Sequence, residues 1–288
     1  MSFAKESRGR RGFTLVELMV SVVLGALLIG IVLNFVTTQS RIATAQSGRE
    51  EVQQNARGAL ELVASDLRGA VSSGIVTGDA DAIELLLPRR WGVVCGQTGT
   101  TRTVVAFPNL PSQPTPVGVD AGLLFQTAAG WRPTLPARAT VNTSTVVPVA
   151  ASCPNATGNV VALQLDGANH PANVPVGTTV ALYQMVRYEV QTSRGSRWIY
   201  RSNGMTTGGV YVMQPLAGPL AEAGGLSFAY FTGTPPVEML GAPGAAAAAQ
   251  NPPISQVRLR VRMQSRQGSA SSRQVEFDSA TVQIRNDN

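Results

Sequence analysis

The sequence predicts an α+β protein in which one long N-terminal helix packs on a head made of an antiparallel β-sheet. Three patterns predict this fold class. Residues 18–36 form an apolar run without a charge, residues 39–70 repeat apolar side chains with helical spacing and contain no proline, and the sequence beyond residue 72 alternates apolar and polar side chains. With 288 residues, the chain is long enough to bury a substantial core.

The apolar run at residues 18–36 has the length of a membrane span. Only Ser21 and Asn34 interrupt it, and as a helix it would extend about 28 Å, close to the thickness of the hydrocarbon core. The apolar core of a cleaved secretory signal is shorter, roughly 7–15 residues. Because the basic flank precedes the run, the positive-inside rule predicts that residues 1–12 are cytoplasmic and that the chain after about residue 40 lies on the other side.

The helix is predicted to continue beyond the membrane. Between residues 39 and 70 the apolar side chains fall on one helical stripe, formed by Val52, Ala56, Leu60, Val63 and Leu67. One helix from Phe13 to about Ala70 would extend roughly 87 Å. Its two halves differ in pattern, so we expect the first half to pack against other helices and the second half against the chain's own head.

Residues 73–288 are predicted to form a globular, antiparallel β-rich head. The clearest strand covers residues 257–263, where apolar side chains alternate strictly with arginines. Two stretches rich in proline and glycine, residues 108–118 and 233–253, are predicted to be long loops. The alanine run at residues 245–249 is expected to belong to the second loop rather than to form a turn of helix.

Glu17 does not fit an ordinary membrane anchor, because a carboxylate at the edge of an apolar span normally has a partner. The string from Arg10 to Leu18, RRGFTLVEL, resembles the class III signal of type IV pilins and type II secretion pseudopilins. The resemblance implies cleavage between Gly12 and Phe13, N-methylation of Phe13, and a contact between Glu17 and the N-terminal amine of an adjacent subunit. The alternative is that the Glu17 side chain reaches the lipid headgroups.

The resemblance narrows at two places in the chain. Residues 55–68, NARGALELVASDLR, are similar to the helix end of PilW-type minor pilins and of the J-type minor pseudopilin, and residues 281–286 are closer to the PilW type. This implies a type IV pilin-like fold and a minor pilin that takes part in initiating a type IV pilus and sits at or near its tip. Two alternatives stay open: a J-type type II secretion pseudopilin, and a tip subunit that binds DNA for uptake and competence or mediates adhesion.

The same resemblance implies the partners and the location of the protein. The partners would be the prepilin peptidase, other minor pilins, the major pilin, the inner-membrane assembly platform and, before assembly, membrane lipid. Nucleic acid is a partner only in the DNA-uptake alternative. The chain would cross the inner membrane once, with its head in the periplasm, and then enter the filament, at its tip.

Cys95 and Cys153 are predicted to form a disulfide. Both follow the membrane segment and so lie on its non-cytoplasmic side, where two cysteines in one chain usually pair. A loop of this size would stabilise the head by roughly 4 kcal/mol through loop-closure entropy. Two free thiols are the alternative.

Residues that carry catalysis are scarce. One histidine and two cysteines exclude a zinc site built from several of them and a four-cysteine iron–sulfur cluster. Asp79, Asp81 and Glu84 lack the spacing of a dedicated calcium loop, and His170 is expected in a loop. We therefore predict a structural protein rather than an enzyme, with no cofactor and no metal.

Three arginines, Arg258, Arg260 and Arg262, are predicted to project from one strand face about 6.8 Å apart. They are candidate contacts for another pilin or for DNA phosphates. The net charge of +6 adds little support for DNA, because residues 1–12 hold four basic residues and one acidic residue, half of that total. No aromatic residues interleave with the arginines, as a platform for single-stranded DNA would require. A solvated face or a pilin contact is therefore the favoured interpretation.

Overall fold

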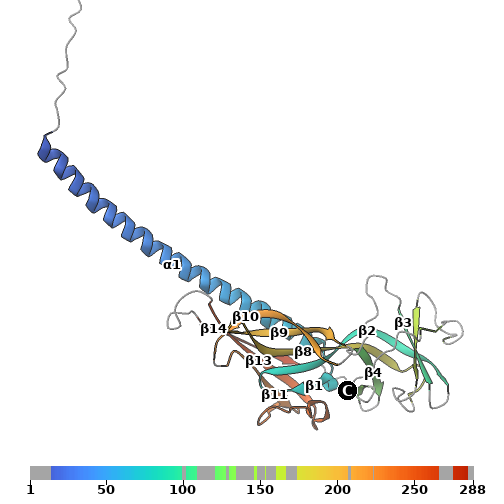
Figure 1. Cartoon of the computed structure of the whole chain (residues 1–288). Helices are drawn as coiled ribbons and strands as arrows, with labels where there is room; N and C mark the ends of the chain where they lie inside the picture. The colour runs from blue at the N-terminus through green and yellow to red at the C-terminus, as the bar shows by residue number, and fades with distance from the viewer. Residues whose placement is uncertain are drawn as a thin grey trace, which may run out of the picture.

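A computed structural model gives the fold of most of the chain. It consists of one long helix, α1 (Leu15–Gly69), that projects as a rod from a head built of antiparallel strands (Figure 1). The predicted α+β fold class is confirmed. The residues that the structure describes are 14–98, 102–108, 121–127, 130–133, 146–147, 153, 160–166, 174–206, 209–222, 224–265 and 275–284.

Both ends of α1 are defined by hydrogen bonds. The helix begins after Thr14, whose Oγ1 accepts a hydrogen bond of 3.3 Å from the backbone N–H of Glu17 and so satisfies one of the free amides of the first turn. It ends where the N–H of Ala70 donates to the carbonyl of Asp66 at 3.1 Å. The helix is continuous from its apolar half into its amphipathic half.

The described strands form one branched sheet of fourteen strands, and every pairing in it is antiparallel. Its main path runs β12-β11-β13-β10-β9-β8-β2-β3-β7-β6. The strands are β1 (Ile75–Gly78), β2 (Ala82–Thr98), β3 (Arg102–Pro108), β4 (Ala121–Thr127), β5 (Gly130–Pro133), β6 (Val146–Val147), β7 (Val160–Asp166), β8 (Thr179–Ser193), β9 (Ser196–Met205), β10 (Tyr211–Leu220), β11 (Leu226–Thr232), β12 (Val237–Glu238), β13 (Ile254–Gln264) and β14 (Val275–Gln283).

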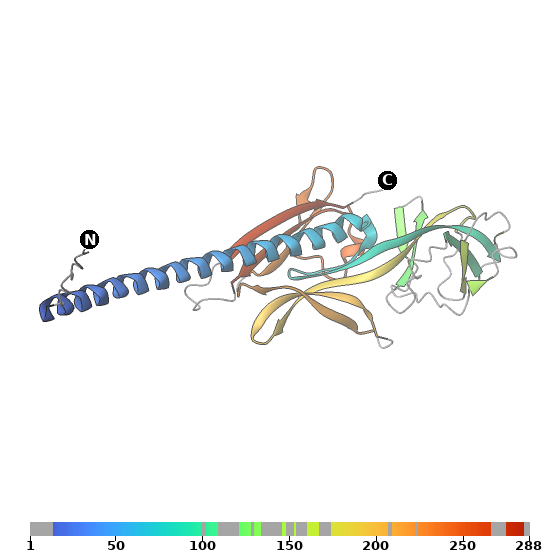
Figure 2. The same cartoon turned by 90° about the horizontal axis from the view of Figure 1, so that it is seen from above.

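β2 and β8 form the axis of this sheet, because they pair with each other over most of their length. The other edge of β8 is shared, since its first part pairs with β4 and its last part with β9. The head therefore divides into a body beside α1 and a distal lobe, β3 to β7, which lies beyond the C-terminal end of α1 (Figure 1 and Figure 2).

The second half of α1 packs on the body of the head, where it contacts β14, β13, β10 and β2. Its buried residues share one face and include the whole predicted stripe; they are Gly48, Val52, Ala56, Ala59, Leu60, Val63, Ala64 and Leu67. Facing them are the apolar side chains of β13, among them Val257 and Leu259. The predicted packing of the amphipathic half is thus confirmed.

The strands along the axis are buried on both faces, whereas the alternating pattern predicted one buried face. Leu85 and Val186 belong to the core beneath α1. Leu86, the next residue of β2, is buried in a second core on the opposite face, together with Tyr183 and Trp131. The branch through β4 and β5 helps to build this second core, because Leu124 of β4 and Trp131 of β5 pack there with Tyr183 of β8.

The long loops were predicted only in part. Pro108 ends β3, and the remainder of the loop at residues 108–118 lies outside the described residues. The predicted leader, residues 1–12, also lies outside them. In the second loop, residues 233–253, the structure places the short strand β12 and a 3₁₀ turn at Ala247–Ala249. Ala247 is buried against the core, so the alanine run is more ordered than the predicted loop.

An ionic cluster fastens the C-terminal end of α1 to the sheet. Tyr188 on β8 donates its hydroxyl hydrogen to Asp66 Oδ2 at 2.6 Å, and Arg201 Nη2 on β9 lies 3.0 Å from the same oxygen. Arg201 Nε also donates to the Tyr188 hydroxyl oxygen at 2.9 Å. Burial, reinforced by the negative charge of Asp66, raises the pKa of Tyr188, so the phenol stays protonated and donates.

We expect Arg201→Met to destabilise the head by about 1–3 kcal/mol, because it leaves the half-buried Asp66 carboxylate without its cation. Thermal unfolding of the detergent-solubilised protein measures this effect. Each kcal/mol of lost stability should lower the unfolding temperature by about 2–4 °C for a head of this size. Arg260→Met, at an exposed position of β13, is the control and should unfold like the wild type. Equal unfolding temperatures for the two variants would contradict a stabilising role of the cluster.

Candidate functional site

The first half of α1 exposes apolar side chains in every direction. From Leu15 to Val36 the large apolar side chains are at least half exposed, Leu15 by 76 % and Phe35 by 62 %. Within the described part of the chain, α1 is the helix that is long and apolar enough to cross a membrane, and none of its most apolar stretch is buried by the head. A helix that is apolar all round requires lipid or other apolar helices around it.

Most polar groups in this segment are satisfied within the helix itself. The Ser21 hydroxyl donates to the carbonyl of Glu17 at 2.7 Å, and the hydroxyls of Thr37 and Thr38 both donate to the carbonyl of Asn34 at 2.9 Å. These hydroxyls therefore add little cost in an apolar environment.

Glu17 is different, because its carboxylate makes no hydrogen bond or ion pair with any residue that the structure describes. The backbone N–H of Glu17 is held by Thr14, as described above, while the side chain is exposed in the apolar segment. Gly12 and Phe13, the predicted cleavage and methylation residues, lie outside the described residues. A charged group in such surroundings needs a countercharge, and the described chain does not provide one.

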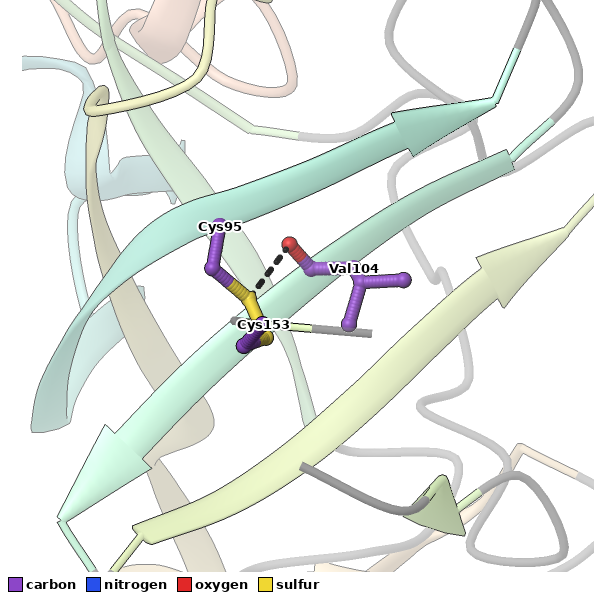
Figure 3. The surroundings of a disulfide bond; sticks show 3 residues. All are labelled: Cys95, Val104 and Cys153. Atoms are coloured by element: carbon purple, nitrogen blue, oxygen red, sulfur yellow. Dashed lines mark hydrogen bonds between the residues drawn. A yellow bond between two sulfur atoms is a disulfide. The ribbon is translucent and has the colours of Figure 1, made fainter. Parts of the chain in front are cut away.

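The two cysteines come together in the distal lobe. Cys95 on β2 and Cys153 are joined as a disulfide, with their Cα atoms 5.1 Å apart (Figure 3). Cys153 is buried against Val104 and Ala162. The Cys95 sulfur lies 3.5 Å from the carbonyl oxygen of Val104, a van der Waals contact because a disulfide sulfur has no hydrogen to donate. This arrangement fits the predicted pairing.

We expect thiol alkylation of the denatured, unreduced protein to label neither cysteine, and alkylation after reduction to label both. The double variant Cys95→Ser/Cys153→Ser should lose up to about 4 kcal/mol of stability, because the disulfide closes a loop with a sequence separation of 58. Labelling of both cysteines before reduction would contradict the disulfide.

The carboxylates considered for calcium do not form a cluster. Glu84 is buried and lies 3.5 Å from Arg187 Nη1, and the same arginine binds Glu189. Burial raises the pKa of Glu189, but its hydrogen bonds from Arg187 and Gln191 outweigh that effect and lower the pKa overall. Among the described residues, no group of three histidines, cysteines or acidic side chains is placed to hold a metal ion. His170 lies outside those residues.

The three arginines of β13 share one face, but their surroundings differ. Arg258 is half-buried; its Nη1 lies 3.4 Å from Glu238 Oε2, and its guanidinium lies 4.7 Å from the centroid of the Phe231 ring. Arg260 and Arg262 are exposed and make no ion pair in the part of the chain that the structure describes. The three positions are therefore not an equivalent row of free cations.

Two further features, one at the start of α1 and one on β14, were not predicted from the sequence. Thr14 caps α1, and the spacing Thr14-x-x-Glu17 is a known sequence signature of helix starts. Phe277 on β14 is 58 % exposed although it lies in the body of the head. The spacing of Phe277 and the buried residues Val282 and Ile284 indicates a strand. No pattern in the nearby sequence indicates that the strand face with Phe277 is exposed.

Comparison with known proteins identifies the N-terminal segment. Residues 7–33 match the family described as the prokaryotic N-terminal methylation motif, and this stretch contains Gly12, Phe13 and Glu17. Searches of curated proteins and of solved structures found no match. The motif supports a type IV pilin-like protein, a class that includes pseudopilins, and implies processing by prepilin peptidase and assembly with other pilins. Proteins of this class are typically structural subunits rather than enzymes.

Proposed function

We propose that the chain is a PilW-like minor pilin that takes part in initiating and assembling a type IV pilus and sits at its tip. The observation that carries this proposal is the Glu17 carboxylate, which has no partner among the described residues and lies in an apolar helix inside a methylation motif. The size of the head supports a minor role. The distal lobe extends beyond α1, and a bulky head would obstruct the close stacking of many copies (Figure 2).

Before assembly, the apolar half of α1 would span the inner membrane, with the head in the periplasm. The disulfide supports this side of the membrane, because disulfides persist in oxidising compartments such as the periplasm. The assembly platform, other minor pilins and the major pilin would then replace lipid as the surroundings of α1.

In this mechanism the prepilin peptidase cuts between Gly12 and Phe13 and creates a new N-terminal amine. The amine remains cationic after methylation. In the filament, Glu17 of one subunit would face the Phe13 amine of a neighbour, and this pair compensates both charges in an apolar core. In the membrane, each group can still reach the headgroup region, so the pair in the filament offsets the cost of removing both charges from that region.

A J-type pseudopilin of type II secretion is the second candidate. The methylation motif is shared by pilins and pseudopilins, and residues 55–68 resemble both types. The two candidates differ in the subunits that accompany the chain. Mass spectrometry of purified intact filaments distinguishes them, since pilus subunits support the first candidate and secretion-system subunits the second.

We expect the mature protein to begin at N-methylated Phe13. Gly12→Val should leave the full-length precursor in the membrane, because its side chain would obstruct the peptidase at the cleavage site. Intact-mass measurement of the protein from membranes and filaments tests both statements. Mature protein that keeps Met1, or that is cut elsewhere, would rule out the assigned cleavage site.

Glu17→Leu should abolish incorporation into filaments without impairing expression or cleavage. The substitution strands the amine of a neighbouring subunit, and breaking a buried pair costs about 3–5 kcal/mol, which corresponds to a loss of more than a hundredfold. Immunoblots of sheared filaments and membranes, at equal membrane levels, measure the effect.

The matched control is Ser21→Ala, one helical turn further on, whose hydroxyl bonds only to its own helix. It should incorporate like the wild type. If Glu17→Leu also incorporates normally, Glu17 only reaches the headgroups and the assembly mechanism is wrong.

A further inference from the structure

The outer edge of β14 is open along the whole strand. Within the described sheet β14 pairs with β13 alone, and it lies beside α1 (Figure 2, dark red). One of its two edges therefore carries backbone N–H and C=O groups that no strand of the described chain meets. With nine residues, Val275–Gln283, this edge is longer than the usual strand of about 5–6 residues. Such a row of unpaired groups is a template for pairing with another chain.

The register shows which residues face the open edge. The N–H of Ile284 donates to the carbonyl of Ser255 at 2.9 Å, so the backbone groups of Ile284 point toward β13. Successive residues of an antiparallel strand direct their backbone groups to opposite edges, so the odd-numbered residues of β14 point to the open edge. The bonds of β13 agree, because the N–H of Arg262, the partner of Phe277, donates to Gly225 just before β11, on the side away from β14.

Asp278 covers the middle of this edge. Its Oδ1 accepts a hydrogen bond of 2.8 Å from the backbone N–H of Ser279, the central residue of β14. Asp278 is half-buried and lines a groove of about 130 Å³ between β14 and α1, which Arg57 also lines. Among the described residues, Asp278 and Arg57 form no ion pair. The carboxylate therefore binds the backbone of the open edge rather than the cation on α1.

An incoming strand would meet the Asp278 carboxylate at the centre of the edge. To pair there, the strand must place a carbonyl oxygen against the N–H of Ser279, where the Asp278 oxygen already lies. Displacing the carboxylate would cover a charged group without the hydrogen bond that now compensates it, which is costly. Asp278 also alternates in step with the buried residues Val282 and Ile284, so it points inward, toward α1. Inward-pointing charges are a known means of keeping edge strands unpaired.

We propose that Asp278 keeps β14 from pairing with strands of other chains, through its hydrogen bond to the Ser279 N–H. Without this bond, the edge would pair with the same edge of a second copy of the chain. In an antiparallel pair centred on Ser279, Phe277 of each copy lies opposite Thr281 of the other, and no like charges meet once Asp278 is replaced. The inference concerns the head alone, so it goes beyond the proposed function and does not depend on it.

Light scattering during size-exclusion chromatography of the full-length protein in detergent measures the number of chains per particle. Asp278→Val should at least double this number relative to the wild type, because the central N–H of the edge becomes free to pair. Asp278→Asn is the matched control, since it loses the same charge but keeps a side-chain oxygen that can accept from the Ser279 N–H. Thr281→Val, which adds the same valine at an exposed position of β14, is the second control. Both controls should match the wild type.

Amide hydrogen exchange identifies the surface through which the chains associate. In Asp278→Val, residues 275–283 should exchange more slowly than in the wild type, because an added strand protects the N–H groups of the open edge. Equal numbers of chains per particle in Asp278→Val and the wild type would overturn the inference. Association of Asp278→Val without slower exchange of this segment would also overturn it, because another surface is then responsible. Association of Asp278→Asn to the same extent would do so too, because the charge and not the hydrogen bond then keeps the edge unpaired.

Discussion

The structure depends on one stripe of α1, from Gly48 to Leu67, which has to stay covered by the sheet. Full burial of an aliphatic side chain contributes about 1.5–3 kcal/mol, and this stripe holds several of them, so separating α1 from the head is strongly unfavourable. The strands β13 and β14 form the surface that the stripe requires. The remaining residues of α1 have no such surface in the described chain, and they must obtain one from lipid or from other subunits.

Because α1 is one continuous helix, its attachment to the head also fixes the orientation of its far end. Asp66 is held by Tyr188 and Arg201, which prevents rotation of the helix on the sheet. Glu17 lies 49 residues earlier, about 74 Å along the axis. The packing of the second half of α1 on the sheet therefore sets the position of Glu17 relative to the head.

The sequence predicted features that local patterns determine, and it missed those that depend on distant pairing. The stripe of α1 and the alternation in β13 follow from helical and strand periods, which each short segment carries by itself. The second core does not, because Leu86 of β2 is buried there against residues of β4, β5 and β8, which lie far from it along the chain. The environment of the arginines is similarly non-local, since Glu238, twenty residues from Arg258, distinguishes that residue from Arg260. The residues that match the methylation motif, 7–33, also belong to a part of the chain that short sequence patterns are enough to predict.

Two carboxylates on the same helix show why this chain is best understood as a subunit. Asp66 sits where α1 meets its own head, and a tyrosine and an arginine from two strands compensate its charge. Glu17 sits in a far more apolar segment, where an uncompensated charge is costlier, yet the described chain brings no cation to it. The chain thus compensates the less costly charge, Asp66, and supplies no described partner for the more costly charge, Glu17. This difference is explained if the partner of Glu17 comes from another molecule. The N-terminal amine that the methylation motif implies is a cation at the right end of the helix for this role.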